Sequence, residues 1–223
     1  ITRGRSIALG GCRDVMVTGN MVTMGNDGAG IGTETTVHHV VISNNIIDMN
    51  GRGRQGGSGI GIASDDSSFV TINGNQVFGG HPDSVCLHVA TVQHGVISNN
   101  LLRVSKGRVN GGDVNGCGIR IGRPSTPHDW HLLVSGNRIH SPITRNVGIH
   151  LVAGGADSVK SHVQLLNNTV DGFQFAISLD RQVGGRYSDV TIRGNTSTRS
   201  PLVAKQSRAD RRVVIQGNSE PTR

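Results

Sequence analysis

The chain has 223 residues, of which 35% are hydrophobic and only 3% are aromatic, so its composition disfavours a globular domain with a broad core. A thin repetitive coil with a narrow aliphatic core has no such limitation. The net charge is +7 and the sequence pI is near 10.3, which favours an anionic partner such as an acidic polysaccharide. No apolar run is long enough for a transmembrane helix, so we expect no membrane partner.

One short pattern recurs along the chain, first at residues 15–22 and then at residues 40–47 and 70–77. Alternating apolar residues lead to a key Asn, and an apolar residue follows it. The eight members of the series are Asn20, Asn45, Asn75, Asn100, Asn137, Asn168, Asn195 and Asn218. Spacing of this kind, within about 20–50 residues, is typical of a repeat architecture. The alternation predicts a half-buried β-strand before each Asn.

The residue before each key Asn is always Gly or Asn, as at Gly19 and Asn44. These are the two residues that adopt a positive φ at the lowest energetic cost, so we expect a left-handed bend at this point. If successive bends stack, the key Asn side chains can form a hydrogen-bonded ladder along the coil axis.

A second strand is predicted after a loop in most copies. The segments are residues 59–62, 85–88, 118–121, 148–151 and 176–179. Two or three short strands per turn, with no helical stretch, predict a coil of parallel strands. Equivalent residues of successive turns would then lie about 4.8 Å apart.

This organisation resembles the right-handed parallel β-helix of the pectin-lyase-like superfamily, and the resemblance covers residues 6–218. It implies an all-β fold, a right-handed parallel β-helix solenoid of about eight turns in a single domain over residues 1–223. It also implies a role on polysaccharides, because most members act on them through one face of the coil. The sequence begins within a predicted strand, so we expect it to be a segment of a longer protein.

Alternation along the second strand predicts a cluster of polar side chains on the outer face. Arg120 and His150 are expected in one outward column on successive turns, about 5 Å apart. Cys86 is expected in the same column, and His88 and Asp180 are expected diagonally beside the pair.

This cluster suits a uronic acid. Arg120 would neutralise the sugar carboxylate, and His150 would remove the proton alpha to it, which leads to elimination or epimerisation. His88 and Asp180 complete the catalytic candidates. The alternative is that these side chains only make the surface of the solenoid soluble.

Six further residues are candidates for substrate binding, most of them in loops before or after the second strand. They are Glu34, Arg52, Arg54, Lys106, Arg108 and Trp130. The basic members would line an electropositive groove, or else belong to solvated glycine-rich loops. Trp130 would stack on a sugar ring, or else fix its loop against the coil.

Two functions remain open at this point. The first is a secreted β-helix that binds an acidic polysaccharide and modifies it as a lyase, epimerase or hydrolase, without metal or cofactor. The second is a non-catalytic segment of a phage tail spike or surface adhesin, on the virion or cell surface and as a homotrimer in the tail-spike case. The scarcity of Trp and Tyr disfavours nucleic acid. Three cysteines in no zinc-binding spacing indicate free thiols.

Overall fold

The computed structural model describes residues 4–24, 28–33, 36–49, 60–65, 67–79, 84–104, 117–122, 131–142, 147–153, 159–181, 185–202 and 211–220. All regular elements in these ranges are β-strands, and no helix there has the length and apolar character needed to cross a membrane. The glycine-rich and β-branched composition of the repeats accounts for short strands separated by tight turns.

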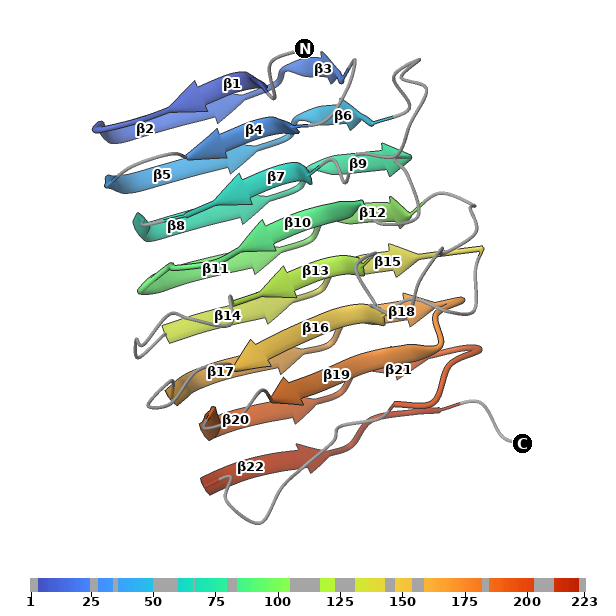
Figure 1. Ribbon diagram of the computed structural model, residues 1–223. Coiled ribbons are helices and arrows are strands. Elements are labelled where there is room, and N and C mark those ends of the chain that lie inside the picture. Colours follow the sequence, from blue (N-terminus) through green and yellow to red (C-terminus); the bar gives the residue numbers. More distant parts are fainter. Residues whose placement is uncertain are drawn as a thin grey trace.

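The strands form three parallel sheets that wind together as a parallel β-helix, so the predicted fold class is confirmed (Figure 1). Sheet A contains seven strands: β1 (Gly4–Leu9), β4 (Gly28–Thr33), β7 (Ile60–Ser64), β10 (Val85–Val89), β13 (Cys117–Ile121), β16 (Val147–Ala153) and β19 (Phe175–Arg181). Sheet B contains eight: β2 (Arg13–Thr18), β5 (Val37–Ser43), β8 (Ser67–Asn73), β11 (His94–Ser98), β14 (His131–Ser135), β17 (Val159–Leu166), β20 (Arg186–Arg193) and β22 (Arg211–Gln216). Sheet C contains seven: β3 (Met21–Thr23), β6 (Ile46–Asp48), β9 (Gln76–Gly79), β12 (Leu101–Val104), β15 (Arg138–His140), β18 (Thr169–Asp171) and β21 (Thr196–Ser197). From β1 to β21, each winding visits sheets A, B and C in that order, and β22 adds a further strand to sheet B.

The turn from sheet B to sheet C is the left-handed bend that the sequence predicts. At all eight bends the residue before the key Asn has a positive φ, from 53° at Asn167 to 69° at Gly19. Gly and Asn adopt this region with the least strain, which explains why one or the other is found at this position in every copy.

The key Asn residues form the predicted ladder. The side-chain amide of Asn100 donates to Oδ1 of Asn137 at 2.9 Å and to the Ile72 carbonyl at 3.0 Å. Its own Oδ1 accepts the backbone N–H and the side-chain amide of Asn75, each at 3.0 Å. The same bonds repeat from Asn20 to Asn218. Each buried amide is therefore satisfied within the column, as burial of a polar group requires.

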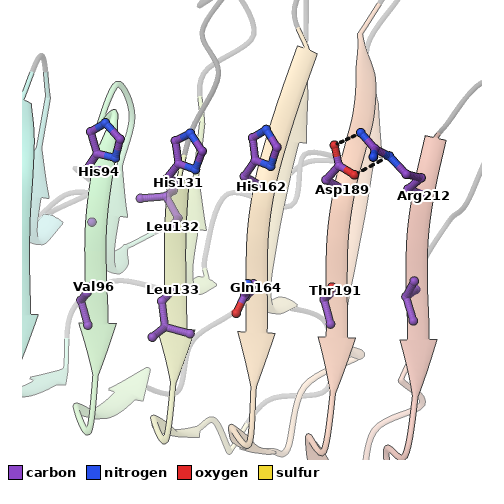
Figure 2. Close-up of a pocket in the computed structure, with 12 residues that line it drawn as sticks. His94, Val96, His131, Leu132, Leu133, His162, Gln164, Asp189, Thr191 and Arg212 are labelled. Atoms are coloured by element: carbon purple, nitrogen blue, oxygen red, sulfur yellow. Dashed lines mark hydrogen bonds and ion pairs between the residues drawn. The ribbon is translucent and has the colours of Figure 1, made fainter.

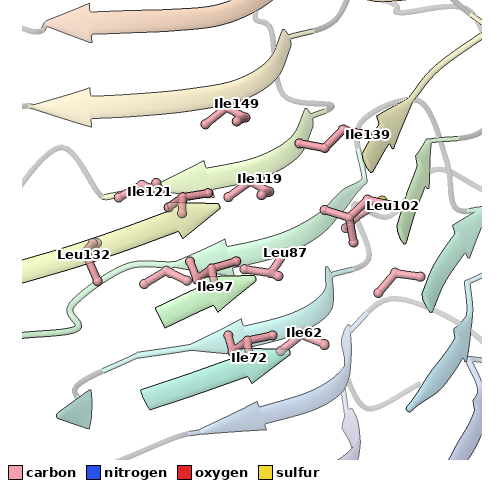
Figure 3. Close-up of a cluster of buried hydrophobic side chains, with 14 of the residues drawn as sticks. Ile62, Ile72, Leu87, Ile97, Leu102, Ile119, Ile121, Leu132, Ile139 and Ile149 are labelled. Carbon is pink, nitrogen blue, oxygen red and sulfur yellow. The ribbon is translucent and has the colours of Figure 1, made fainter. Parts of the chain in front are cut away.

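Aliphatic side chains from the three sheets fill the interior in columns that run parallel to the ladder (Figure 3). Ile62, Leu87, Ile119 and Ile149 form one such column from sheet A, and all are buried. Each winding fills its narrow interior with a few aliphatic side chains, such as Val70, Ile72 and Val77, so the coil needs few aromatic residues to close its core.

Replacing Asn100 by Ala should destabilise the coil by about 3 kcal/mol, because it leaves buried donors of Asn75 and buried acceptors beside residue 100 without partners. The matched control is Asn20→Ala at the first, partly exposed rung, where the loss should be about 1 kcal/mol. Chemical denaturation of both variants measures the difference. Equal losses would contradict a ladder whose strength depends on burial.

Candidate functional site

The predicted neighbours Arg120 and His150 do lie side by side on the outer face of sheet A. In the pairing of neighbouring sheet A strands, His88 of β10 lies opposite Arg120 of β13, and Arg120 lies opposite His150 of β16. Ala63 and Ser178 occupy the same column on either side of these three. We call His88, Arg120 and His150 the basic row.

Two expectations about this cluster were wrong. His88 is not diagonal to Arg120 but is its direct partner on the neighbouring strand. Cys86, which alternation placed on the outer face, is completely buried in the core.

The physical reason is a column of small residues where sheet A meets sheet C. The register aligns Leu87 with Ile119, which leaves Cys86 beside Gly118. A Cβ atom on Gly118 would lie 2.2 Å from Cγ2 of Ile139, so this column also faces the interior. Positions 86 and 87 are both inside, and the period of two that the sequence suggests breaks at this corner.

The environment of the basic row disfavours the charged form of His150. Burial lowers the pKa of His150 below the ordinary value of 6.5, and the positive charge of Arg120 lowers it further. Two unit charges one rung apart, about 4.8 Å, repel by roughly 3 kcal/mol at an effective dielectric constant of about 20. This repulsion disfavours a second positive charge beside the guanidinium.

Asp180 of β19 lies close to His150 and partly opposes these effects. Its carboxylate Oδ2 is 3.5 Å from Nε2 of His150, and its side chain is 55% exposed. Nδ1 of His150 and Nε of Arg120 are buried and have no hydrogen-bond partner in the described part of the chain. The side chain of Arg120 is only half-buried, so an anion could still approach its accessible part and neutralise the positive charge.

The six predicted substrate-binding residues, Glu34, Arg52, Arg54, Lys106, Arg108 and Trp130, lie outside the described residues. The predicted catalytic residues His88, Arg120, His150 and Asp180 are all described. Of these, the structure brings the first three into one row, and it places Asp180 diagonally beside His150, as expected.

A second arrangement, which the sequence interpretation missed, runs along the outer face of sheet B (Figure 2). Five aromatic or imidazole rings are stacked on successive strands, with centroids 4.5 to 5.0 Å apart. We call this set the ring column, and its members are His39, Phe69, His94, His131 and His162. All five side chains are exposed.

Charged residues continue the ring column at both ends. Nδ1 of His39 lies 3.0 Å from Oδ1 of Asp14, one strand before it. Asp189 pairs with Arg212 on the strands after His162, where the Arg212 Nη2 donates to Oδ2 at 2.7 Å. The ring column thus begins beside a carboxylate and ends beside an ion pair.

The sequence does hold a signal for the ring column. Each member lies six residues before a key Asn, as His131 does before Asn137, and Asp14, Asp189 and Arg212 occupy the same position in their copies. Aligning the copies on the Asn would have revealed the series. The apolar alternation alone does not reveal the ring column, because the position of its residues lies before the alternating segment.

A shallow groove of about 610 Å³ runs beside the ring column. Figure 2 shows its two rows: the rings of His94, His131 and His162 form one, and the other contains Val96 and Leu133 with polar neighbours. The exposed Val96 and the half-buried Leu133 therefore lie beside hydrogen-bonding groups.

The other notable charged cluster is structurally saturated. On sheet C, the carboxylate of Asp171 accepts from Nε and Nη2 of Arg199 at 2.9 and 2.8 Å and contacts Nδ1 of His140 at 3.0 Å. These bonds, those of Arg199 first, hold the pKa of Asp171 well below its usual range. Among the residues described, no three His, Cys, Asp or Glu side chains are grouped so that they could hold a metal ion.

No protein-family model matches the sequence, and no similar chain was found among the curated proteins. The functional interpretation therefore depends on the chemistry of the basic row and the ring column.

Only one of the three thiols should react quickly in the folded protein. Burial raises the pKa of Cys86 and raises that of Cys117 to about 12, whereas Cys12 is half-buried. With a thiol-specific reagent at about pH 8, we expect one equivalent to react at once and two more after denaturant is added. Cys12→Ser should abolish the fast phase, and a second fast thiol would contradict the inward position of Cys86.

NMR titration of His150 tests the electrostatics of the basic row. Its pKa should lie below 6.5, should rise in Arg120→Gln, where a positive neighbour is lost, and should fall in Asp180→Asn, where a negative one is lost. The unfolded chain takes up this proton at a higher pH, so the contribution of His150 to stability is lost as the pH falls below about 6.5. Shifts of the opposite sign in either variant would contradict the observed geometry.

Proposed function

We propose that this β-helix binds an acidic polysaccharide, with a sugar carboxylate held at Arg120 in the basic row. The observation that carries the proposal is the half-buried guanidinium of Arg120, which lies between two imidazoles in strict register. A carboxylate that reaches the accessible part of this side chain would neutralise its charge in one contact. The net charge of +7 would attract such a polymer from a distance.

His150 supplies the group for a chemical step at the same place. A neutral imidazole beside a bound uronate can take the proton alpha to its carboxylate. In an elimination, the electron pair left behind forms the new C=C bond while the bond to the glycosidic oxygen breaks. In an epimerisation, water or a second acid on the opposite face of the sugar ring delivers a proton to the same carbon, and His150 keeps the proton that it removed.

Binding ranks ahead of catalysis because of where the ring nitrogens lie. Nδ1 of His150 is buried, and Nε2 faces the Asp180 carboxylate. The second candidate function, a structural rod or receptor-binding segment without chemistry, is favoured by a ladder that continues unchanged from Asn20 to Asn218.

Binding is tested with oligomers of galacturonate, of mannuronate and guluronate, and of glycosaminoglycan, by calorimetry. Arg120→Gln should weaken binding by about tenfold or more, because a charge-assisted bond in a partly buried site is lost. The matched control is Arg138→Gln, which removes the same charge from an exposed position on sheet C and should change affinity less than about twofold.

The ultraviolet absorbance of an unsaturated product, followed in the same mixtures, separates the candidates. An increase that is lost in His150→Ala supports elimination. Binding with no increase supports a glycan-binding rod. If no acidic glycan binds, or if both Arg variants behave alike, the basic row is not a carboxylate site.

A further inference from the structure

The ring column presents the edges of its rings to solvent, not their faces. Successive planes from Phe69 to His162 are nearly parallel, with interplanar angles of 13°, 9° and 5°. Each inner ring therefore has a neighbour against both faces. A nucleic-acid base or a sugar ring has no free face to stack on along the middle of the column, whereas the imidazole nitrogens at the edges remain available for hydrogen bonds.

The groove beside the rings adds the features of an extended polar ligand site. Val96 and Leu133 give it an apolar floor, and Gln164 and Thr191 add hydrogen-bonding groups in the same row. Because the strands repeat at about 4.8 Å, the surface offers similar contacts at regular intervals along the coil axis. A linear polymer with regularly spaced substituents matches such a surface better than a compact molecule does.

The backbone is left-handed at this position in most copies of the repeat. His39, Phe69 and His162 have φ values of 54°, 56° and 54°, a region in which Gly would be less strained. Asp14, Asp189 and Arg212 share this conformation, with φ values of 55°, 55° and 51°, whereas His94 and His131 do not. Non-glycine residues held in this region often cluster at functional sites. Each copy also has a positive φ directly before the key Asn, and Gly or Asn always occupies that position. The repeat therefore uses low-strain residues at one left-handed position but not at the position of the ring column.

We propose that the ring column and its groove form a second binding surface, for an extended anionic polysaccharide, whose carboxylate or sulfate groups bond to the ring edges of His94, His131 and His162. Affinity increases as the pH falls, because a protonated imidazole binds an anion more strongly than a neutral one does. This surface is on a different sheet from the basic row and does not depend on glycan binding there.

Among the residues that the structure describes, the charged groups seen against the two ends of the ring column are paired. Asp14 contacts His39 at one end, and Asp189 is held by Arg212 at the other. The side chains on the strands of His94 and His131 that line the groove are apolar. The three central imidazoles are therefore the groups whose charging changes the surface.

The test uses heparin oligosaccharides, whose sulfates stay ionised, so that any pH dependence comes from the protein. Affinity of the wild type should be at least about tenfold higher at about pH 5.5 than at about pH 8. Replacing His94, His131 and His162 together by Gln should remove this difference, and the single change His131→Gln should reduce it. The matched control His140→Gln removes an imidazole from sheet C and should retain the full pH dependence.

Arg120→Gln distinguishes the two surfaces. If the pH dependence of heparin binding persists in Arg120→Gln and vanishes in the triple variant, the ring column is a glycan-binding surface. This conclusion holds even if the basic row binds no carboxylate. The proposal is overturned if the triple variant keeps the pH dependence of the wild type. It is also overturned if single-stranded DNA of equal charge binds this surface more tightly than heparin, or if sedimentation shows that the triple variant loses self-association instead of glycan binding.

Discussion

The register between successive windings is the constraint on which the rest of the molecule depends, and the Asn ladder enforces it. Each key Asn binds the next through both its side chain and its backbone N–H, for example from Asn75 to Asn100. A slip of one residue would break these buried bonds and turn core side chains outward. With the register fixed, any residue type repeated at a given position becomes a continuous column on the surface.

Much of this architecture can be predicted from the sequence, because the repeat is local and chemically explicit. The alternation before each Asn predicts sheet B, and the Gly or Asn before it predicts the left-handed bend. The adjacency of Arg120 and His150 also follows, because their strands share the same apolar pattern. His88 and Cys86 could not be placed by alternation, since the inward column at Cys86 depends on how closely sheet A approaches sheet C at Gly118.

The ring column shows a different limit of single-residue reasoning. Its members are scattered through the chain as isolated histidines and one Phe, and none is unusual alone. Their relation appears only when residues at the same distance from the key Asn, such as His94 and His131, are brought to neighbouring strands by the fold. His162 has a positive φ within its strand. A residue in this conformation interrupts the regular alternation of inward and outward side chains, on which the sequence prediction depends.

The Asn ladder has a direction. From Asn20 to Asn195, each side-chain amide donates to Oδ1 of the key Asn in the following copy, and Asn218 at the end only accepts within the series. The amide dipoles therefore add along the axis, and the column is polar, with an acceptor face toward one end and a donor face toward the other. A further winding, from this polypeptide or from another, can extend the Asn ladder only if its donor end meets the acceptor end of the existing ladder, or the reverse. If two coils met with the same end, acceptor groups would face acceptor groups or donor groups would face donor groups.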